Sequence, residues 1–192
     1  KESANPGYPE WTRRRIVDAN TFYTGLSLAE QEKTLFVLLS AGSFNSPNSL
    51  QTDKRVIFEC QHMIDHLKEL GIPKEKIFGD IFSWDTVTNG LSLRLLLDGL
   101  AVYQARDTSI EIEVFISDFH FQRMEAVLTW VLGLEPSLLS AKKVHLNMHT
   151  VHSNGIPELT PETLEERAKH EAKGAEIILA NSKKVRTVQE FC

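Results

Sequence analysis

The sequence predicts an α/β fold in which parallel strands alternate with helices. Two observations lead to this prediction: short apolar runs of strand character recur along the chain, and longer helical patterns separate them. Connections of this kind between parallel strands are right-handed crossovers. At 192 residues the chain has the size of one ordinary domain, so we expect a single domain over residues 1–192.

The first two expected elements are a helix over residues 11–23 and a strand over residues 34–39. Apolar side chains follow a roughly helical spacing in the helix, at Trp11, Ile16, Ala19 and Tyr23. We expect the arginines at positions 13–15 to form a basic turn on its solvent side. The strand is a continuous apolar run, as in strands buried on both faces. The loop at 43–53 is long for a βα connection, which favours a functional role.

Strand and helix patterns then alternate to the end of the chain. An apolar stripe over residues 54–70, followed by Gly71, predicts a helix with a C-terminal stop. The last helix has Thr160 as its expected N-cap and Pro161 at its first position. The other expected elements are a strand at 77–83, a helix capped by Asp85 or Thr86 and running through Leu100, a strand at 111–116, a helix at 121–132, a strand at 144–148 and the last helix at 161–180.

Composition and charge argue against two classes of partner. The net charge of -5 leaves no basic surface of the kind that binds nucleic-acid phosphates. No stretch approaches the roughly 18 apolar residues needed to cross a bilayer, so we expect no membrane segment in the chain. The two cysteines, Cys60 and Cys192, show no disulfide framework and no metal-ligand spacing, which favours a reducing, cytoplasmic location.

Three polar clusters, at residues 40–43, 83–86 and 117–120, stand where strand-like runs give way to helical patterns. The carboxyl ends of parallel strands lie on one edge of a sheet, so we expect the clusters to converge on one crevice, where such folds bind ligands. In the first cluster, Ser40 and Gly42 are candidate ligand contacts because small residues let backbone amides approach closely. The alternative is a tight strand exit that needs small residues.

The second cluster contains Ser83, Asp85 and Thr86, and Asn89 lies one helical turn further on. We expect these side chains to hydrogen-bond a polar ligand at the crevice. Helix capping is the alternative explanation for Asp85 or Thr86, but it does not explain Asn89.

The third cluster provides the candidate catalytic residues, His120 and Arg123, with Ser117 beside them. A helix N-terminus attracts anions and Arg123 offers paired donors, so together with His120 they would hold a phosphate or carboxylate. Because histidine is the usual acid–base side chain near neutral pH, His120 is also a candidate general acid or base.

Glu59 falls in the apolar stripe of its helix, where an unpartnered carboxylate is costly to bury. We expect a partner for it, either a ligand or Arg123; an exposed position at the edge of the stripe is the alternative. Histidines also recur at spacings that superficially suggest metal ligation, at His62, His66, His145, His149 and His152. His62 and His66, four residues apart on one predicted helix, lack the neighbouring glutamate of a zinc-protease motif, and we expect no metal site.

In this order, the motifs resemble those of the YdcF-like family, a large group of unknown function that also contains the bacterial envelope proteins SanA and ElyC. The resemblance covers roughly residues 13–190. The matching motifs are Ser40-Ala41-Gly42, Glu59-x-x-x-Met63, Gly71-Ile72-Pro73, Ser83-x-Asp85-Thr86-x-x-Asn89 and Ser117-x-Phe119-His120-x-x-Arg123.

The resemblance implies a Rossmann-like three-layer sandwich with a mostly parallel sheet, and S-adenosylmethionine as a candidate ligand. The family pattern opens with a strand and a Gly-containing turn that do not precede Trp11 here. We therefore expect this first strand to lie upstream of the sequence, or part of the pocket to be missing. Carried over position by position, the pocket residues are Ser40, Gly42, Glu59, Ser83, Asp85, Thr86, Asn89, Ser117, His120 and Arg123.

Together these observations predict a soluble α/β domain that binds a small anionic or nucleotide-like metabolite at the C-terminal ends of the strands. If the protein is an enzyme, hydrolysis or group transfer at a phosphorylated or adenosyl substrate is expected, with His120 as acid or base and Arg123 stabilising negative charge. The alternative is a non-catalytic ligand sensor or assembly module. A Ser-His-Asp hydrolase ranks last, because no convincing nucleophile elbow is present. The oligomeric state is not predicted.

Overall fold

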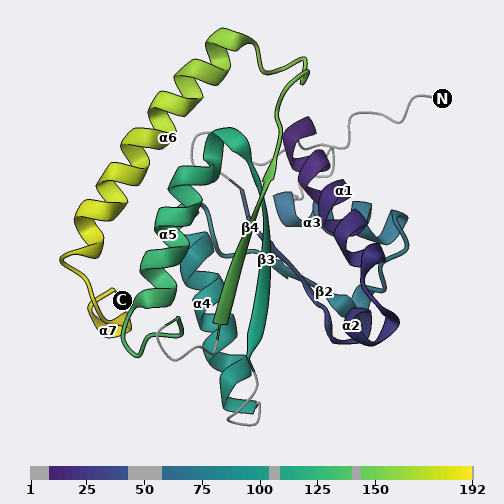
Figure 1. Cartoon of the computed structure of the whole chain (residues 1–192), viewed down its shortest axis with the longest axis horizontal. Coiled ribbons are helices and arrows are strands. Elements are labelled where there is room, and N and C mark those ends of the chain that lie inside the picture. The colour runs from purple at the N-terminus through teal and green to yellow at the C-terminus, as the bar shows by residue number, and fades with distance from the viewer. Residues whose placement is uncertain (1–8, 43–57, 104–108, 140–143, 192) are drawn as a thin grey trace, which may run out of the picture. The chain divides into compact units, whose positions relative to one another are not determined.

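The computed structural model describes residues 9–42, 58–103, 109–139 and 144–191. Contacts within the chain fall into two compact units, Lys1–Ser92 and Leu93–Cys192. Each unit contains one pair of parallel strands with helices packed against it, as the ribbon in Figure 1 shows.

The first unit confirms the helix expected at residues 11–23 and both expected strands, although each strand is shorter than its apolar run. The two strands pair in parallel, with Phe36 opposite Ile77 and Leu39 opposite Asp80. The loop at 43–53 and the start of the helix expected at 54–70 lie outside the described residues. The elements are α1 (Glu10–Gly25), α2 (Leu28–Lys33), β1 (Phe36–Leu39), α3 (Glu59–Glu69), the 3-10 turn η1 (Lys74–Lys76), β2 (Ile77–Asp80) and the start of α4 (Thr86–Tyr103).

Two local signals fix where helices of this unit begin and end. Ser27 and Glu30 form a reciprocal capping box that starts α2, a helix too short for apolar periodicity to predict. Gly71 ends α3 with a φ of 89°, and Ile72 N donates to Leu67 O at 3.0 Å. This arrangement is a Schellman motif, and it confirms the C-terminal stop that the sequence predicts at Gly71.

The core of the first unit lies where α1 and α3 pack against β1 and β2. The rings of Tyr23 and Phe36 meet edge to face with their centroids 5.2 Å apart. Gly79 of β2 leaves room for Ile64, because a Cβ at this glycine would lie 2.7 Å from Ile64 Cδ1. The buried side chains of this core are Ile16, Tyr23, Phe36, Cys60, Met63, Leu67 and Ile72.

The second unit confirms the strands and helices expected in the second half of the chain. Its two strands pair in parallel along their whole length, from Ile110 opposite Val144 to Ser117 opposite Val151. Helices α5 and α6 lie side by side (Figure 1). The elements are the rest of α4, β3 (Ile110–Ser117), the 3-10 turn η2 (Asp118–His120), α5 (Phe121–Gly133), β4 (Val144–Val151), α6 (Pro161–Ser182) and α7 (Val188–Phe191).

The two faces of the β3–β4 sheet differ in chemistry. Side chains alternate between faces along a strand, and one face carries Ile112, Val114 and Ile116. On the other face, Asn147 Nδ2 donates to Glu113 Oε1 at 2.8 Å, and the ring of His149 contacts the same carboxylate and stacks on Phe115. Polar faces of this kind are typical of a sheet face that meets water. A second helical layer on this face therefore stays a prediction.

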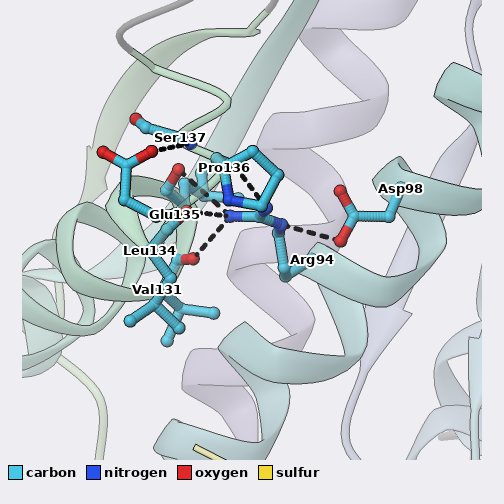
Figure 2. A network of polar contacts seen from close by, with 8 residues as sticks. Arg94, Asp98, Val131, Leu134, Glu135, Pro136 and Ser137 are labelled. Atoms are coloured by element: carbon cyan, nitrogen blue, oxygen red, sulfur yellow. Dashed lines mark hydrogen bonds and ion pairs between the residues drawn. The ribbon is translucent and has the colours of Figure 1, made fainter. Parts of the chain in front are cut away.

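A buried arginine hydrogen-bonds backbone carbonyls near the C-terminal end of α5. The Arg94 side chain of α4 is completely buried, and its guanidinium donates to the carbonyls of Val131 at 3.1 Å, Leu134 at 3.0 Å and Pro136 at 2.6 Å (Figure 2). Its Nε donates to Asp98 one turn away at 2.8 Å. The last carbonyls of a helix have no partner within the helix, and they form the negative end of its dipole. Arg94 therefore donates to the buried carbonyls of Val131, in the last turn of α5, and Leu134, just after it, and also to the part-buried carbonyl of Pro136.

These observations confirm a mixed α/β fold with parallel strands and with the predicted order of elements. The N-cap at Thr160 is also confirmed, because its Oγ accepts from Thr163 N. In the described residues the strands form two separate two-stranded sheets, β1–β2 and β3–β4. The single domain and the Rossmann-like three-layer sandwich stay predictions.

Candidate functional site

The first two polar clusters meet at the C-terminal edge of the β1–β2 sheet. Ala41 N, just beyond β1, donates to the Ser83 carbonyl at 2.8 Å, which joins the chain segments that leave the two strands. Ser40 and Ala41 also accept hydrogen bonds from the first backbone amides of α3, with Cys60 N 2.9 Å from Ser40 O and Glu59 N 3.1 Å from Ala41 O. Ala41 itself has no exposed surface, which is consistent with a tight strand exit at this position.

Glu59 has a partner that the sequence did not predict. Ser40 Oγ donates to Glu59 Oε2 at 2.6 Å, and both side chains are partly buried. A partner for this carboxylate is therefore present at the neighbouring strand exit, and a ligand or Arg123 as its partner stays a prediction. Arg15 of α1 lies within electrostatic range of the same carboxylate.

Arg15 corrects the expected basic turn on the solvent side of α1. Arg13 pairs with Glu10 at 2.6 Å on the surface of the helix. Arg15 instead turns inward and donates from Nη2 to Thr12 Oγ at 2.8 Å, and Thr12 is completely buried. Position 15 follows Thr12 by three residues and precedes Ala19 by four, so it shares the buried face of the helix.

Asp80 and Ser83 form a compact turn after β2. Both residues are buried, and Asp80 accepts a hydrogen bond from Ser83 Oγ and another from Phe82 N at 2.8 Å. The thiol of Cys60 lies nearby. Its burial, assisted by the negative charge of Asp80, raises the pKa of this thiol to about 11. Ser83 thus shapes the turn, and Cys60 is held as an unreactive thiol.

Asp85 caps α4, which confirms the structural alternative for this residue. Its Oδ1 accepts from Thr88 N at 2.8 Å, and its carbonyl accepts from Asn89 N at 2.9 Å. Thr86 is the first residue of the helix and is buried. The Oδ1 of Asn89 is shielded from solvent and has no hydrogen-bond partner among the described residues. Asn89 therefore remains the residue of this cluster that capping does not explain.

The third cluster lies in the second unit, at the C-terminal ends of β3 and β4. Asp118 joins the two ends, because it accepts from Phe119 N at 2.9 Å and from Ser153 N at 3.0 Å. Burial would raise the pKa of Asp118, but the hydrogen bonds from Ser153 and Phe119 outweigh burial, and the pKa is lowered. Asp118 thereby fixes the loop from which the His120 side chain projects.

His120 and Arg123 converge on one carboxylate, Glu171 of α6. His120 Nδ1 lies 2.5 Å from Glu171 Oε2, and Arg123 Nη1 lies 3.7 Å from the same oxygen. Burial alone would raise the pKa of Glu171, but the hydrogen bond from His120 and the positive charges of His120, Arg123 and His170 outweigh it. The pKa of Glu171 is therefore lowered, and its carboxylate orients the imidazole ring.

Gly174 provides the space that the Arg123 side chain occupies. A Cβ at this glycine of α6 would lie 3.0 Å from both Cδ and Nε of Arg123. The Nε of Arg123 is shielded from solvent, and so is the hydroxyl of Ser117; neither atom has a hydrogen-bond partner within the described parts of the chain. Both groups retain hydrogen-bonding capacity at the end of β3.

Sequence reasoning missed two residues of these clusters, Glu171 and Arg15. Glu171 is one of several glutamates along α6, and no local pattern distinguishes it. The nearest signal is Gly174, because a glycine inside a helix costs stability and often marks a close approach. For Arg15 the signal was the helical spacing itself, which places it on the same face as Ile16 and Ala19.

The predicted pocket residues thus fall into two groups. The first unit contains the residues of the first two clusters and of α3, which are Ser40, Gly42, Glu59, Ser83, Asp85, Thr86 and Asn89. The second unit contains Ser117, His120 and Arg123. One crevice shared by all of them stays a prediction. Among the residues described, no group of three or more His, Cys, Asp or Glu side chains is arranged to hold a metal, and no helix is long and apolar enough to cross a membrane.

Comparison with protein-family models, with curated proteins and with solved structures gives no match for this chain.

Proposed function

We propose that the protein binds a small anionic or nucleotide-like metabolite at the C-terminal end of β3, where His120 and Arg123 hold its negatively charged group. The observation that supports this most directly is the position of Arg123, whose Nε is buried without a hydrogen-bond partner in the described residues. A buried polar atom left without a partner is costly, and this cost is acceptable where a ligand supplies the acceptor. Phosphate and carboxylate match the planar donors of arginine.

The contact between His120 and Glu171 suits this imidazole to acid–base chemistry. A carboxylate that accepts from Nδ1–H keeps the neutral ring in the tautomer whose lone pair is on Nε2. Glu171 would also stabilise the imidazolium that forms when Nε2 takes a proton. Hydrolysis or group transfer at a phosphorylated or adenosyl substrate is therefore the reaction class we propose, with Arg123 stabilising negative charge that develops near it.

The ordered motifs shared with the YdcF-like family support the same proposal, and they make S-adenosylmethionine a candidate ligand whose carboxylate Arg123 would hold. Within the first unit, considered by itself, Asn89 is the strongest candidate for a ligand contact, because its Oδ1 is buried without a partner in the described residues. A non-catalytic ligand sensor or assembly module is the second candidate, favoured because Glu171 already occupies His120 and Arg123 in a stable network.

A thermal-shift screen over adenosyl compounds, nucleotides, sugar phosphates and inorganic phosphate tests the proposal. We expect at least one anionic compound to raise the melting temperature of the wild type and to lose its effect in Arg123→Met. Lys169→Met is the matched control, because Lys169 lies on α6 in an exposed ion pair with Glu165. Equal stabilisation of the wild type and Arg123→Met by every hit would remove the proposal.

Product analysis of each hit then separates the two candidate functions. Turnover that His120→Gln abolishes would support an enzyme, because the variant keeps a polar side chain but lacks an imidazole that can take up and release a proton. Binding without turnover would support the sensor.

A further inference from the structure

Among the described residues, the Arg15 guanidinium has more hydrogen-bond donors than acceptors to receive them. A guanidinium carries five N–H donors, and the bond that this one makes is to Thr12, three residues earlier on the same helix. The Nε atom is shielded from solvent and has no hydrogen-bond partner in the described part of the chain. Burial lowers the pKa of this guanidinium, and the charge of Glu59 opposes that effect. Buried charges in proteins are normally paired and hydrogen-bonded, so Arg15 is poorly explained as a stabilising residue.

The groups beside Arg15 are acceptors with spare capacity. Glu59 accepts one hydrogen bond from Ser40 Oγ at 2.6 Å, and an ionised carboxylate has about four acceptor positions. The carboxylate of Asp80 lies at the same edge of the sheet, after β2. The Arg15 guanidinium therefore lies within electrostatic range of a carboxylate that Ser40 holds at the C-terminal edge of β1.

The charge at this edge indicates which chemistry fits. The described residues at and beside this edge include three carboxyl groups, of Glu59, Asp80 and Asp85, and the guanidinium of Arg15 lies within electrostatic range of the first of them. A phosphate or carboxylate ligand would add to the excess of negative charge. A hydroxyl group carries no charge, donates one hydrogen bond and accepts two, so it matches a carboxylate and a guanidinium at once.

We propose that Arg15, Ser40 and Glu59 form a binding site for the vicinal diol of a sugar at the C-terminal end of β1. One hydroxyl of the diol donates to the Glu59 carboxylate and the other accepts from the Arg15 guanidinium, while Ser40 holds Glu59 in place. The site lies within the first unit and uses neither His120 nor Arg123, so it goes beyond the function proposed above.

The first test measures stability without any ligand. Replacing Arg15 by Met keeps much of the side-chain volume and removes a guanidinium whose Nε is shielded from solvent without a hydrogen-bond partner in the described residues, so the cost of burying that group is relieved. We expect Arg15→Met to keep or raise the melting temperature of the wild type. A fall of more than about 5 °C would assign Arg15 a structural role and overturn the proposal.

The second test measures binding by NMR titration of the full chain with methyl β-D-ribofuranoside and with its 2-deoxy counterpart. We expect saturable shifts with the first sugar and binding at least about tenfold weaker with the second, because one hydrogen bond to the site is lost. Uridine and 2′-deoxyuridine, titrated in the same way, distinguish a nucleoside from a free sugar as the source of the diol.

The variants make the binding test specific. We expect Arg15→Met and Glu59→Gln each to weaken ribofuranoside binding at least about tenfold. Arg13→Met is the matched control, since Arg13 lies on the same helix and pairs with Glu10 at the surface, and it should bind like the wild type. No saturable shift with any diol, or equal binding in Arg15→Met and the wild type, would overturn the proposal. Binding of inorganic phosphate tests the anion site at Arg123, whereas binding of the sugars tests the diol site at Arg15 and Glu59. The failure of one proposal can therefore be distinguished from the failure of the other.

Discussion

Arg94 Nη2 donates to the carbonyl of Pro136 at 2.6 Å, across 42 residues of sequence. The buried guanidinium also donates to the carbonyls of Val131 and Leu134 near the end of α5, and its bond to Pro136 is the shortest of the three (Figure 2). The same side chain pairs with Asp98 on its own helix. One arginine therefore joins α4 to the end of α5 and supplies positive charge to the negative end of the α5 dipole.

The first prediction is that Arg94→Met lowers the free energy of unfolding by about 3–5 kcal/mol, because it removes the donor to the buried carbonyls of Val131 and Leu134. Urea denaturation measures this change. Asp98→Asn is the control and should cost less than about 1 kcal/mol, since the Asp98 side chain is partly exposed. If Arg94→Met stayed within 1 kcal/mol of the wild type, as a rough limit, the carbonyl contacts would not contribute as we argue.

The second prediction concerns acid. The pKa of Glu171 is lowered in the folded protein, so its contribution to stability is present above its unfolded-state pKa and is lost as the pH falls through the lower, folded value. We expect the melting temperature of the wild type to fall more steeply below about pH 4.5 than that of Glu171→Gln. Glu165→Gln, on the same helix but in an exposed ion pair, should follow the wild type. Parallel pH profiles for the wild type and Glu171→Gln would contradict the role assigned to Glu171.

The third prediction tests the space around Arg123. In Gly174→Ala the new Cβ pushes the Arg123 side chain by a few tenths of an ångström, so we expect weaker binding of the anionic hits, measured by calorimetry. Stability should change little or rise, because alanine favours a helix over glycine by about 1 kcal/mol. Gly99→Ala on α4, where a Cβ meets no atom within 4 Å, should gain the same helix propensity without loss of binding. Loss of binding in both variants would show that Arg123 is not the cause.

The fourth prediction separates capping from ligand binding at Asp85. Asp85→Ala removes the acceptor for Thr88 N and should lower the free energy of unfolding by about 1 kcal/mol. Asparagine is an equally good N-cap, so Asp85→Asn should remain close to the wild type in thermal denaturation. If Asp85→Asn retained stability but lost binding of every hit in the ligand screen, Asp85 would be a ligand contact as well as a cap.

The elements of the fold were largely predictable because their signals are local. Apolar periodicity located the helices that became α1 and α5, and the caps at Thr160 and Gly71 set a beginning and an end. The bounds of the strands were less predictable: β1 and β2 are shorter than their apolar runs, whereas β3 and β4 extend beyond the predicted residues. Pairing requires a neighbouring strand, and an apolar run does not reveal where its partner ends. The short helix α2 was not predicted, because a capping box marks its start and it is too short to show an apolar stripe.

The candidate residues were predictable by position but not by partner. The sequence by itself placed Ser40, His120 and Arg123 at the ends of strands, because polarity at a strand exit is a local pattern. Only the tertiary structure decided that His120 meets Glu171, 51 residues later, and that Glu59 meets Ser40 while Arg15 turns inward. The physical reason is that a buried charge takes whichever partner packing brings within a few ångströms, and packing joins helices and strands that are distant in sequence.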